Sequence, residues 1–274
     1  MDRRLEIALV AVAVVLVLLV GVVAVGFYQF TRPIPDSYTH TYEYRTYIQP
    51  DETLTNVTLY LPLPVENGSS PAGDALVGGS PGVTDAPPGW SFAVEDTSAG
   101  PMLALSFPEL APTYYERQPP RSLEPGAGTP TRGETPTGTP IRSLDYYLVS
   151  VEWASEEPID TRSPVGNEPT LQPRLNATET PCDGPTTEGQ ACRRFGSWMY
   201  LSYDAPANAT LDVLVTYEGY NEWFAGGWTG TLFRQSTRTV VVGDGPGWIA
   251  ADGEEEVGVG TYRGAPQAVP AQAA

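Results

Sequence analysis

Residues 7–27 form an uninterrupted apolar run, IALVAVAVVLVLLVGVVAVGF, without a charged or polar side chain. As an α-helix with a rise of about 1.5 Å per residue, the run reaches roughly 30 Å, the thickness of the hydrocarbon core of a bilayer. Arg3 and Arg4 precede it, and Asp36 is the first of several acidic residues that follow it. Because basic residues stay on the cytoplasmic side, the sequence predicts a single-pass cell-membrane protein with residues 1–6 in the cytoplasm and the rest of the chain outside.

A cleavable signal peptide is the main alternative to a membrane anchor. Ala24, Val25 and Gly26 form a small-x-small triplet at the end of the run. The apolar core of a signal peptide usually spans roughly 7 to 15 residues, so the longer run here favours a retained anchor. A lipoprotein would need a cysteine directly after the run, and the first cysteine is Cys182.

The charge balance limits the partners of the chain. It has 33 acidic and 15 basic residues, a net charge of -18, and no lysine. Such a chain repels phosphate backbones, which excludes nucleic-acid binding. Acidity combined with the absence of lysine favours a protein from a high-salt environment, where salt screens carboxylate repulsion; an ordinary acidic secreted protein is the alternative.

Alternation with a period of two predicts strands after the anchor. Residues 38–49, YTHTYEYRTYIQ, place tyrosines and His40 on one face, and threonines and charged residues on the other. No segment after the anchor has a sustained 3.6-residue apolar stripe. We therefore expect an all-β fold, an extracellular β-sandwich over residues 36–264 with long Pro-, Thr- and Gly-rich loops. The other predicted strands are 56–63, 90–95, 102–107, 144–153, 197–203, 211–217, 231–242 and 257–262.

Two stretches interrupt the strand pattern. Residues 112–140 have almost no large apolar side chains, which predicts a mobile loop or linker. Residues 156–189 are similar, and we expect a long loop there. The tail 265–274 is expected to be disordered. One sandwich is preferred over two small domains, because the strands before residue 112 are too few for an independent core.

The two cysteines, Cys182 and Cys192, lie in the part of the chain expected outside the membrane. In an oxidising setting they predict a disulfide that closes a short loop. A zinc site would need further ligands, and His40 is the only histidine. The same shortage excludes a blue-copper site, which needs two histidines and a cysteine thiolate.

Four asparagines stand in the Asn-x-Ser/Thr acceptor pattern for N-glycosylation, which is more than chance alone predicts for this composition. Glycans at these positions are expected on turns and strand edges of an exported domain. The four sites are Asn56, Asn67, Asn176 and Asn208.

No catalytic motif is expected to function. Residues 78–82 spell G-x-S-x-G, but the hydrolase elbow needs a backbone N–H directly after the serine, and Pro81 has none. His40 is expected to be a packed strand histidine. Asp252 and the run 254–256 are expected in an acidic, solvated turn rather than in a calcium loop. The sequence therefore predicts no catalytic residue, no metal site and no cofactor.

The densest aromatic segment is 217–233, YEGYNEWFAGGWTGTLF. Its rings either fill the core at a corner of the sheet or form a binding face for a glycan or a partner. Core packing is the preferred interpretation. The residues of the alternative binding face are Tyr220, Trp223, Phe224 and Trp228.

The arrangement of a short basic start, one anchor and an acidic extracellular β domain with glycosylation motifs resembles haloarchaeal single-span surface proteins. The segments that carry the resemblance are YLPLP at 60–64, GPMLAL at 100–105, IDTRSPVGNEP at 159–169 and YEGYNEWFAGGW at 217–228. The resemblance implies a location and no activity.

Three hypotheses on function remain. The leading one is a non-enzymatic, membrane-tethered surface protein with a structural or interaction role in the envelope or as an accessory subunit of a membrane complex. The second is a carbohydrate- or ligand-binding module that uses the aromatic cluster. The third is a hydrolase with a carboxylate pair, whose separation a sequence cannot give.

Overall fold

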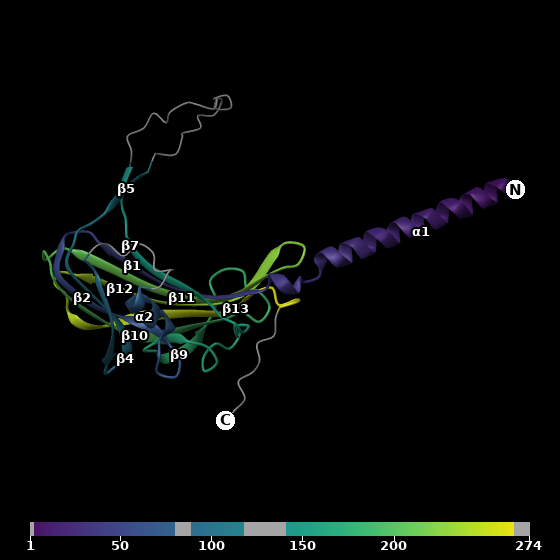
Figure 1. Cartoon of the computed structure of the whole chain (residues 1–274). Helices are drawn as coiled ribbons and strands as arrows, with labels where there is room; N and C mark the ends of the chain where they lie inside the picture. The colour runs from purple at the N-terminus through teal and green to yellow at the C-terminus, as the bar shows by residue number, and fades with distance from the viewer. Residues whose placement is uncertain (1–2, 80–88, 118–140, 266–274) are drawn as a thin grey trace, which may run out of the picture.

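A long N-terminal helix, α1, projects from a β domain (Figure 1). The structure is a computed structural model that describes residues 3–79, 89–117 and 141–265. Helix α1 covers Arg3–Thr31, and the short 3-10 helix η1 covers Pro35–Ser37. Among the described residues, α1 is the one helix long and apolar enough to cross a membrane, which fits a membrane anchor or a signal sequence.

Most strands of the domain belong to one antiparallel sheet with the order β3-β4-β2-β10-β13-β12-β11-β1-β7; β8 pairs with β2, and β9 pairs with β10. Strands β5 and β6 form a separate two-stranded ribbon. The bounds are β1 Thr39–Pro50, β2 Leu54–Val65, β3 Ser91–Thr97, β4 Gly100–Leu110, β5 Tyr114–Arg117, β6 Ile141–Leu144, β7 Tyr147–Ala154, β8 Thr170–Gln172, β9 Leu175–Thr180, β10 Ala191–Asp204, β11 Thr210–Phe224, β12 Trp228–Val242 and β13 Gly247–Gly260.

The sheet curls so that its inner face packs against itself. Strands β1 and β2 are not neighbours in the sheet, yet the Tyr44 hydroxyl donates a 2.9 Å hydrogen bond to the Pro62 carbonyl. The prediction of an all-β domain after an N-terminal helix is confirmed. Both layers of the expected sandwich belong to a single curled sheet.

Period-two alternation fills the core. In β1, Tyr42, Tyr44 and Ile48 point inward, and the facing residues of β11 are buried as well. The Tyr42 and Tyr217 rings stack with centroids 5.9 Å apart. Burial of such large side chains contributes about 1.5–3 kcal/mol each, which makes this aromatic layer a main source of stability.

A short helix, α2 (Pro71–Gly78), lies against β2 and the two end strands of the sheet, β3 and β7. Ser70 caps it by accepting a 3.1 Å hydrogen bond from the Gly73 backbone, and Gly79 ends it in the left-handed conformation (φ 63°). Its Ala72 and Leu76 side chains are buried. This helix was not predicted from the sequence, because its eight residues are too few to show a periodic apolar stripe.

Each of the nine predicted strands overlaps a strand of the structure. The expected acidic turn at 252–256 is instead part of β13, which alternates exposed and buried residues. Residues 156–189 contain β8 and β9. Of the expected loop 112–140, residues 114–117 form β5, and 118–140 lie outside the described residues; so do 266–274 of the tail and 80–82 of the G-x-S-x-G motif.

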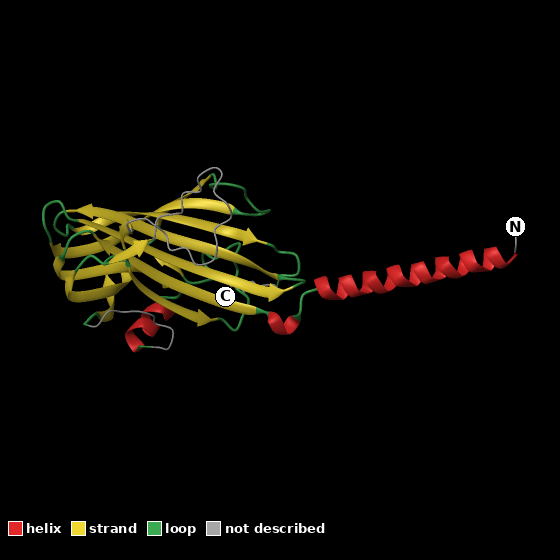
Figure 2. Cartoon of the chain, turned by 90° about the horizontal axis from the view of Figure 1, so that it is seen from above, coloured by secondary structure: helices red, strands yellow, loops and turns green. Residues whose placement is uncertain are grey.

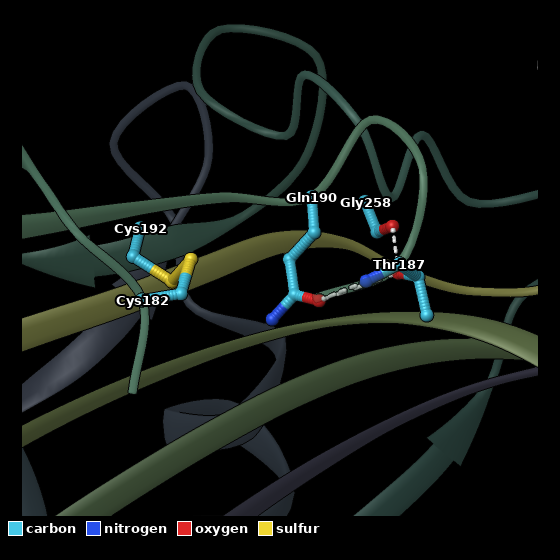
Figure 3. Close-up of a disulfide and its surroundings, with 5 residues drawn as sticks. All are labelled: Cys182, Thr187, Gln190, Cys192 and Gly258. Carbon is cyan, nitrogen blue, oxygen red and sulfur yellow. Dashed lines mark hydrogen bonds between the residues drawn. A yellow bond between two sulfur atoms is a disulfide. The ribbon is translucent and has the colours of Figure 1, made fainter. Parts of the chain in front are cut away.

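The predicted disulfide between Cys182 and Cys192 is present, with Cα atoms 5.2 Å apart (Figure 3). The segment between the cysteines also bonds to itself and to β13. Thr187 donates its backbone N–H to the Gln190 side chain at 2.9 Å and its hydroxyl to the Gly258 carbonyl at 3.3 Å. These bonds hold the segment beside the sheet.

The long strands run nearly along the direction of α1 (Figure 2). One end of the domain therefore lies beside α1, and we name it the α1 end. The start of β1 and the turn between β11 and β12 lie there, because Thr39 pairs with Glu222. The opposite end holds the connection from β10 to β11 and the last residue of β12, Val242, which pairs with Thr210.

Candidate functional site

A cleft of about 820 Å³ opens at the α1 end of the domain, between the last residues of β7 and the loop at residues 159–169. This volume lies in the range of small-ligand sites, roughly 300–1,000 Å³. The cleft lies beside the start of β1, where Ser155 donates its backbone N–H to the His40 carbonyl at 2.8 Å. Ala265, the last described residue of the chain, also lines it.

The 159–169 loop is held by its own hydrogen bonds. The Asp160 carboxylate accepts the backbone N–H groups of Arg162 at 3.1 Å and Ser163 at 2.9 Å. The Asn167 amide donates to the same carboxylate and to the Ser163 carbonyl, both at 3.0 Å. Asp and Asn stabilise turns through such bonds to nearby backbone. One wall of the cleft is therefore largely preformed.

Glu168 joins this loop to the sheet. Its carboxylate accepts the Tyr42 hydroxyl on one oxygen and the Asp160 backbone N–H, at 2.5 Å, on the other. Burial raises the pKa of Glu168, the negative charges of Asp160 and Glu66 add to that rise, and the two hydrogen bonds oppose it. Burial likewise raises the pKa of Tyr42, so its hydroxyl stays protonated and donates.

Asn221 fixes the floor of the cleft. Its buried side-chain amide donates to the Ile159 carbonyl at 2.9 Å and to the Thr231 hydroxyl at 3.1 Å. Its oxygen accepts the Ile159 backbone N–H at 2.9 Å and lies 2.8 Å from Nδ1 of His40. The Ile159 backbone sets the orientation of the amide, so His40 is the donor to this oxygen. His40 thus has the structural role expected of a strand histidine.

An aromatic ring and several carboxylates border the open part of the cleft. The half-buried Trp153 ring stacks on Tyr42, with centroids 5.3 Å apart. Arg162 is the one basic residue of the described lining. An acidic cleft with an aromatic wall suits a cationic segment or a polyhydroxylated ligand. The carboxylates that line it are Glu66, Glu156, Glu157, Asp160 and Glu168.

The part of the chain that the structure describes holds no group of three or more His, Cys, Asp or Glu side chains placed to bind a metal ion. In β13, Glu254 is exposed and pairs with Arg194, whereas Glu255 is buried between Arg174 and Arg193. Glu254 and Glu255 therefore form ion pairs within the sheet.

The aromatic cluster does not form the row of exposed rings that a sugar-binding face needs. Trp223 is buried beside Tyr38, with ring centroids 6.1 Å apart. Tyr220 and Phe224 lie on the opposite face of β11 and are half-buried, because side chains alternate along a strand. Trp228 alone of the four is exposed, at 68%. The binding hypothesis on Tyr220, Trp223, Phe224 and Trp228 thus loses its geometric basis.

All four asparagines of the glycosylation motifs, Asn56, Asn67, Asn176 and Asn208, are exposed. Three of them, Asn56, Asn67 and Asn176, adopt positive φ angles of 50–53°, which asparagine tolerates better than most residues. The Asn56 amide donates to the Asp204 carboxylate at 2.6 Å, so this nitrogen has a competing partner. The other three sites are the better acceptors on this geometry.

Comparison with known proteins adds no relative: no family model, no curated protein and no solved structure matches the chain. The cleft residues Tyr42, Trp153 and Glu168 were not identified as site residues from sequence, and Asn221 was considered only as a neighbour of the aromatic cluster. The one signal for Glu168 is the segment IDTRSPVGNEP, whose Asp, Asn, Gly and Pro residues are typical of a structured loop.

Proposed function

We propose that this protein is a non-enzymatic cell-surface protein, anchored by α1, that binds a partner of the cell envelope through the cleft. The observation that carries the proposal is the position of the cleft at the α1 end. The Ile34 backbone N–H donates to the Phe224 carbonyl at 3.0 Å, and the Phe224 N–H donates to the Ser37 hydroxyl at 2.9 Å. These bonds tie the exit of α1 to the sheet, which holds the cleft close to the surface of the membrane.

The orientation follows from charge. Arg3 and Arg4 keep the N-terminus in the cytoplasm, so the acidic domain faces outward. Exposed glycosylation motifs and a disulfide suit that compartment. The net charge of -18 without lysine suits a high-salt setting, where the self-repulsion of the domain is screened. The proposal therefore includes that the β domain lies outside the cell, that it is glycosylated and that its surroundings are rich in salt.

The chemistry of the cleft supports binding rather than catalysis. Both oxygens of Glu168 accept structural hydrogen bonds, and His40 faces the Asn221 amide. A general acid or base must be free to exchange a proton with a substrate. The groups with the best chemistry for that role are therefore engaged in holding the 159–169 loop.

A second candidate function is carbohydrate binding in the same cleft. The observation that favours it is the half-buried Trp153 ring beside the exposed carboxylates of Glu156 and Glu157. Aromatic faces stack on sugar rings, and carboxylates accept hydroxyl protons. Sugar rings would then stack on Trp153, and not on the aromatic cluster of residues 217–233.

Site-specific photocrosslinking tests the proposal. A benzophenone amino acid replaces Glu156 at the exposed lip of the cleft, and Val240 on the outer face of β12 serves as the control. Both variants are kept in native membranes at high salt. We expect one defined protein adduct from position 156 and none from position 240. Identical adducts at both positions, or none at either, would contradict a partner in the cleft.

The alternatives give different results in the same preparation. A carbohydrate-binding module retains a polysaccharide of the envelope and loses it in a Glu156→Gln, Glu157→Gln double variant. A carboxylate-dependent hydrolase releases reducing sugar and stops when Glu66 is changed to Gln. Neither substitution touches a residue whose hydrogen bonds hold the 159–169 loop.

A further inference from the structure

The turn between β11 and β12 carries rings that contact the end of α1. The Phe30 and Phe224 rings lie edge to face with centroids 6.1 Å apart, and Phe224 contacts Trp228 in the same way at 5.9 Å. We name Phe30, Phe224 and Trp228 the aromatic tip. Figure 1 shows the light green hairpin of β11 and β12 reaching toward the base of α1.

The contact between the turn and the helix is close. A Cβ atom at Gly226 would stand 3.3 Å from two atoms of the Phe30 ring, and Gly226 has a φ of 76°. Glycine is favoured here both by the backbone conformation and by the ring above it. Together with the two backbone hydrogen bonds of Ile34 and Phe224, this packing fixes the turn beside the helix exit.

The position of the tip relative to a bilayer follows from the helix. The apolar run ends at Phe27 and fills the hydrocarbon core, so residues 28–31 lie within about one helical turn, or roughly 5 Å, of its edge. The headgroup region extends several ångströms beyond that edge. Phe30 therefore lies at the height of the headgroups, with the Phe224 ring packed against it and the Trp228 ring packed against that of Phe224.

The composition of the turn suits this zone. Residues 223–229, WFAGGWT, have no charged side chain, and Trp228 exposes 68% of its surface. Large exposed rings are unfavourable in water, whereas tryptophan is enriched where a bilayer meets water. The net charge of -18 excludes attraction to anionic lipids as the driving force. Contact with the bilayer must therefore be apolar.

We propose that the aromatic tip inserts into the headgroup region of the membrane that α1 spans, as a second attachment of the β domain. This inference rests on the proposed anchor. Two attachments, the helix exit and the turn, restrict the tilt of the domain and hold the cleft at a constant height. The binding partner of the aromatic tip is therefore the headgroup region of the lipid bilayer.

Depth-dependent fluorescence quenching tests the insertion in the full-length protein. Trp228→Cys, labelled with the polarity-sensitive dye NBD, is compared with labelled Val242→Cys in lipid vesicles that contain headgroup-nitroxide lipids. Val242 is 67% exposed and stands at the other end of the 15-residue strand β12, about 45 Å away. The native cysteines are paired, so the new thiol alone reacts.

We expect a blue-shifted emission and a loss of most of the signal at position 228, with the emission at position 242 like that in water. A third label at Val20, within the apolar run, reports the anchor through lipids that carry the nitroxide deep in the acyl chain. Quenching at 20 with water-like emission at 228 would overturn insertion while leaving the anchor intact. Absence of quenching at 20 would overturn the anchor and the insertion together.

Discussion

Glu255 provides the sharpest test of how the sheet holds the segment before the disulfide. The Arg174 guanidinium binds its carboxylate with two parallel hydrogen bonds of 2.9 and 2.8 Å. Arg193 adds a bond of 3.0 Å and Gln235 one of 2.7 Å. The Glu255 side chain is fully buried, and that of Arg174 is 9% exposed. We predict that Glu255→Gln destabilises the domain, although glutamine has nearly the same shape as glutamate.

The magnitude follows from burial. Removing one partner of a buried ion pair leaves the other charge uncompensated and costs about 3–5 kcal/mol. Glutamine also turns one accepting oxygen into a donor, which opposes the donors already around it. The matched control is Glu254→Gln on the same strand: Glu254 and Arg194 are 3.5 Å apart and mostly exposed. An exposed pair of this kind contributes about 0–1 kcal/mol.

The pH dependence gives a second, independent signature. Burial acts to raise the pKa of Glu255, but the bonds from Arg174, Gln235 and Arg193 outweigh it, so the pKa lies below its ordinary value of 4.5. A carboxyl group whose pKa is lowered by folding stabilises the folded state. This stabilisation is fully present above pH 4.5 and is lost as the pH falls through the pKa of the folded state. The difference between the wild-type protein and Glu255→Gln should therefore shrink below pH 4.5.

The assay is urea unfolding of the full chain in mild detergent, followed by tryptophan fluorescence. All six tryptophans follow the apolar run, so the signal reports the β domain. A loss below about 1 kcal/mol for Glu255→Gln at pH 7, equal to that of Glu254→Gln, would show that the buried ion pairs do not stabilise the domain. A difference that stays constant from pH 7 to pH 3 would refute the pKa argument alone.

Three further predictions use the same assay. Gly219→Ala places a Cβ 2.4 Å from the Phe233 ring and should destabilise by about 1–3 kcal/mol, whereas Gly227→Ala, with nothing within 4 Å, should change stability by less than about 1 kcal/mol. Cys182→Ser opens a loop of sequence separation 10 and should cost about 2–3 kcal/mol, with no such difference between the proteins in reductant. The unfolding midpoint should rise with KCl, because about 1 M salt shortens the Debye length to about 3 Å and screens the net charge of -18; a midpoint that falls would contradict self-repulsion.

The fold was predictable where local patterns are strong. The alternation at 38–49 predicts a strand, and β1 buries Tyr42, Tyr44 and Ile48 in that register. The prediction of a solvated turn at 252–256 was wrong, because three adjacent glutamates are typical of a solvent-exposed segment, whereas here they lie in β13. The middle one of the three glutamates, Glu255, is buried between arginines that lie far away in the sequence, and no local pattern reports such pairing.

The cleft could not be derived from the sequence for a related reason. Its Tyr42, Glu168 and Asn221 come from distant positions, and the curl of the sheet brings them together. Each has a plausible ordinary role when read alone. The aromatic segment 217–233 was recognised as important, but the strand register decides that Trp223 enters the core while Trp228 remains exposed at the α1 end. That register depends on pairing with β1 and β12.

Both the anchor and the cleft have the proposed roles only if the β domain is held at the outer face of the cell membrane. Val242→Cys carries the one free thiol of the described residues, exposed at the end far from α1. Intact cells that make this variant are treated with a membrane-impermeant maleimide, and the membrane fraction is then analysed by mass. We expect full labelling on intact cells, on a chain that retains residues 1–27 and stays in the membrane fraction. Labelling only after lysis, or a labelled chain that lacks residues 1–27 and is found in the medium, would contradict this location.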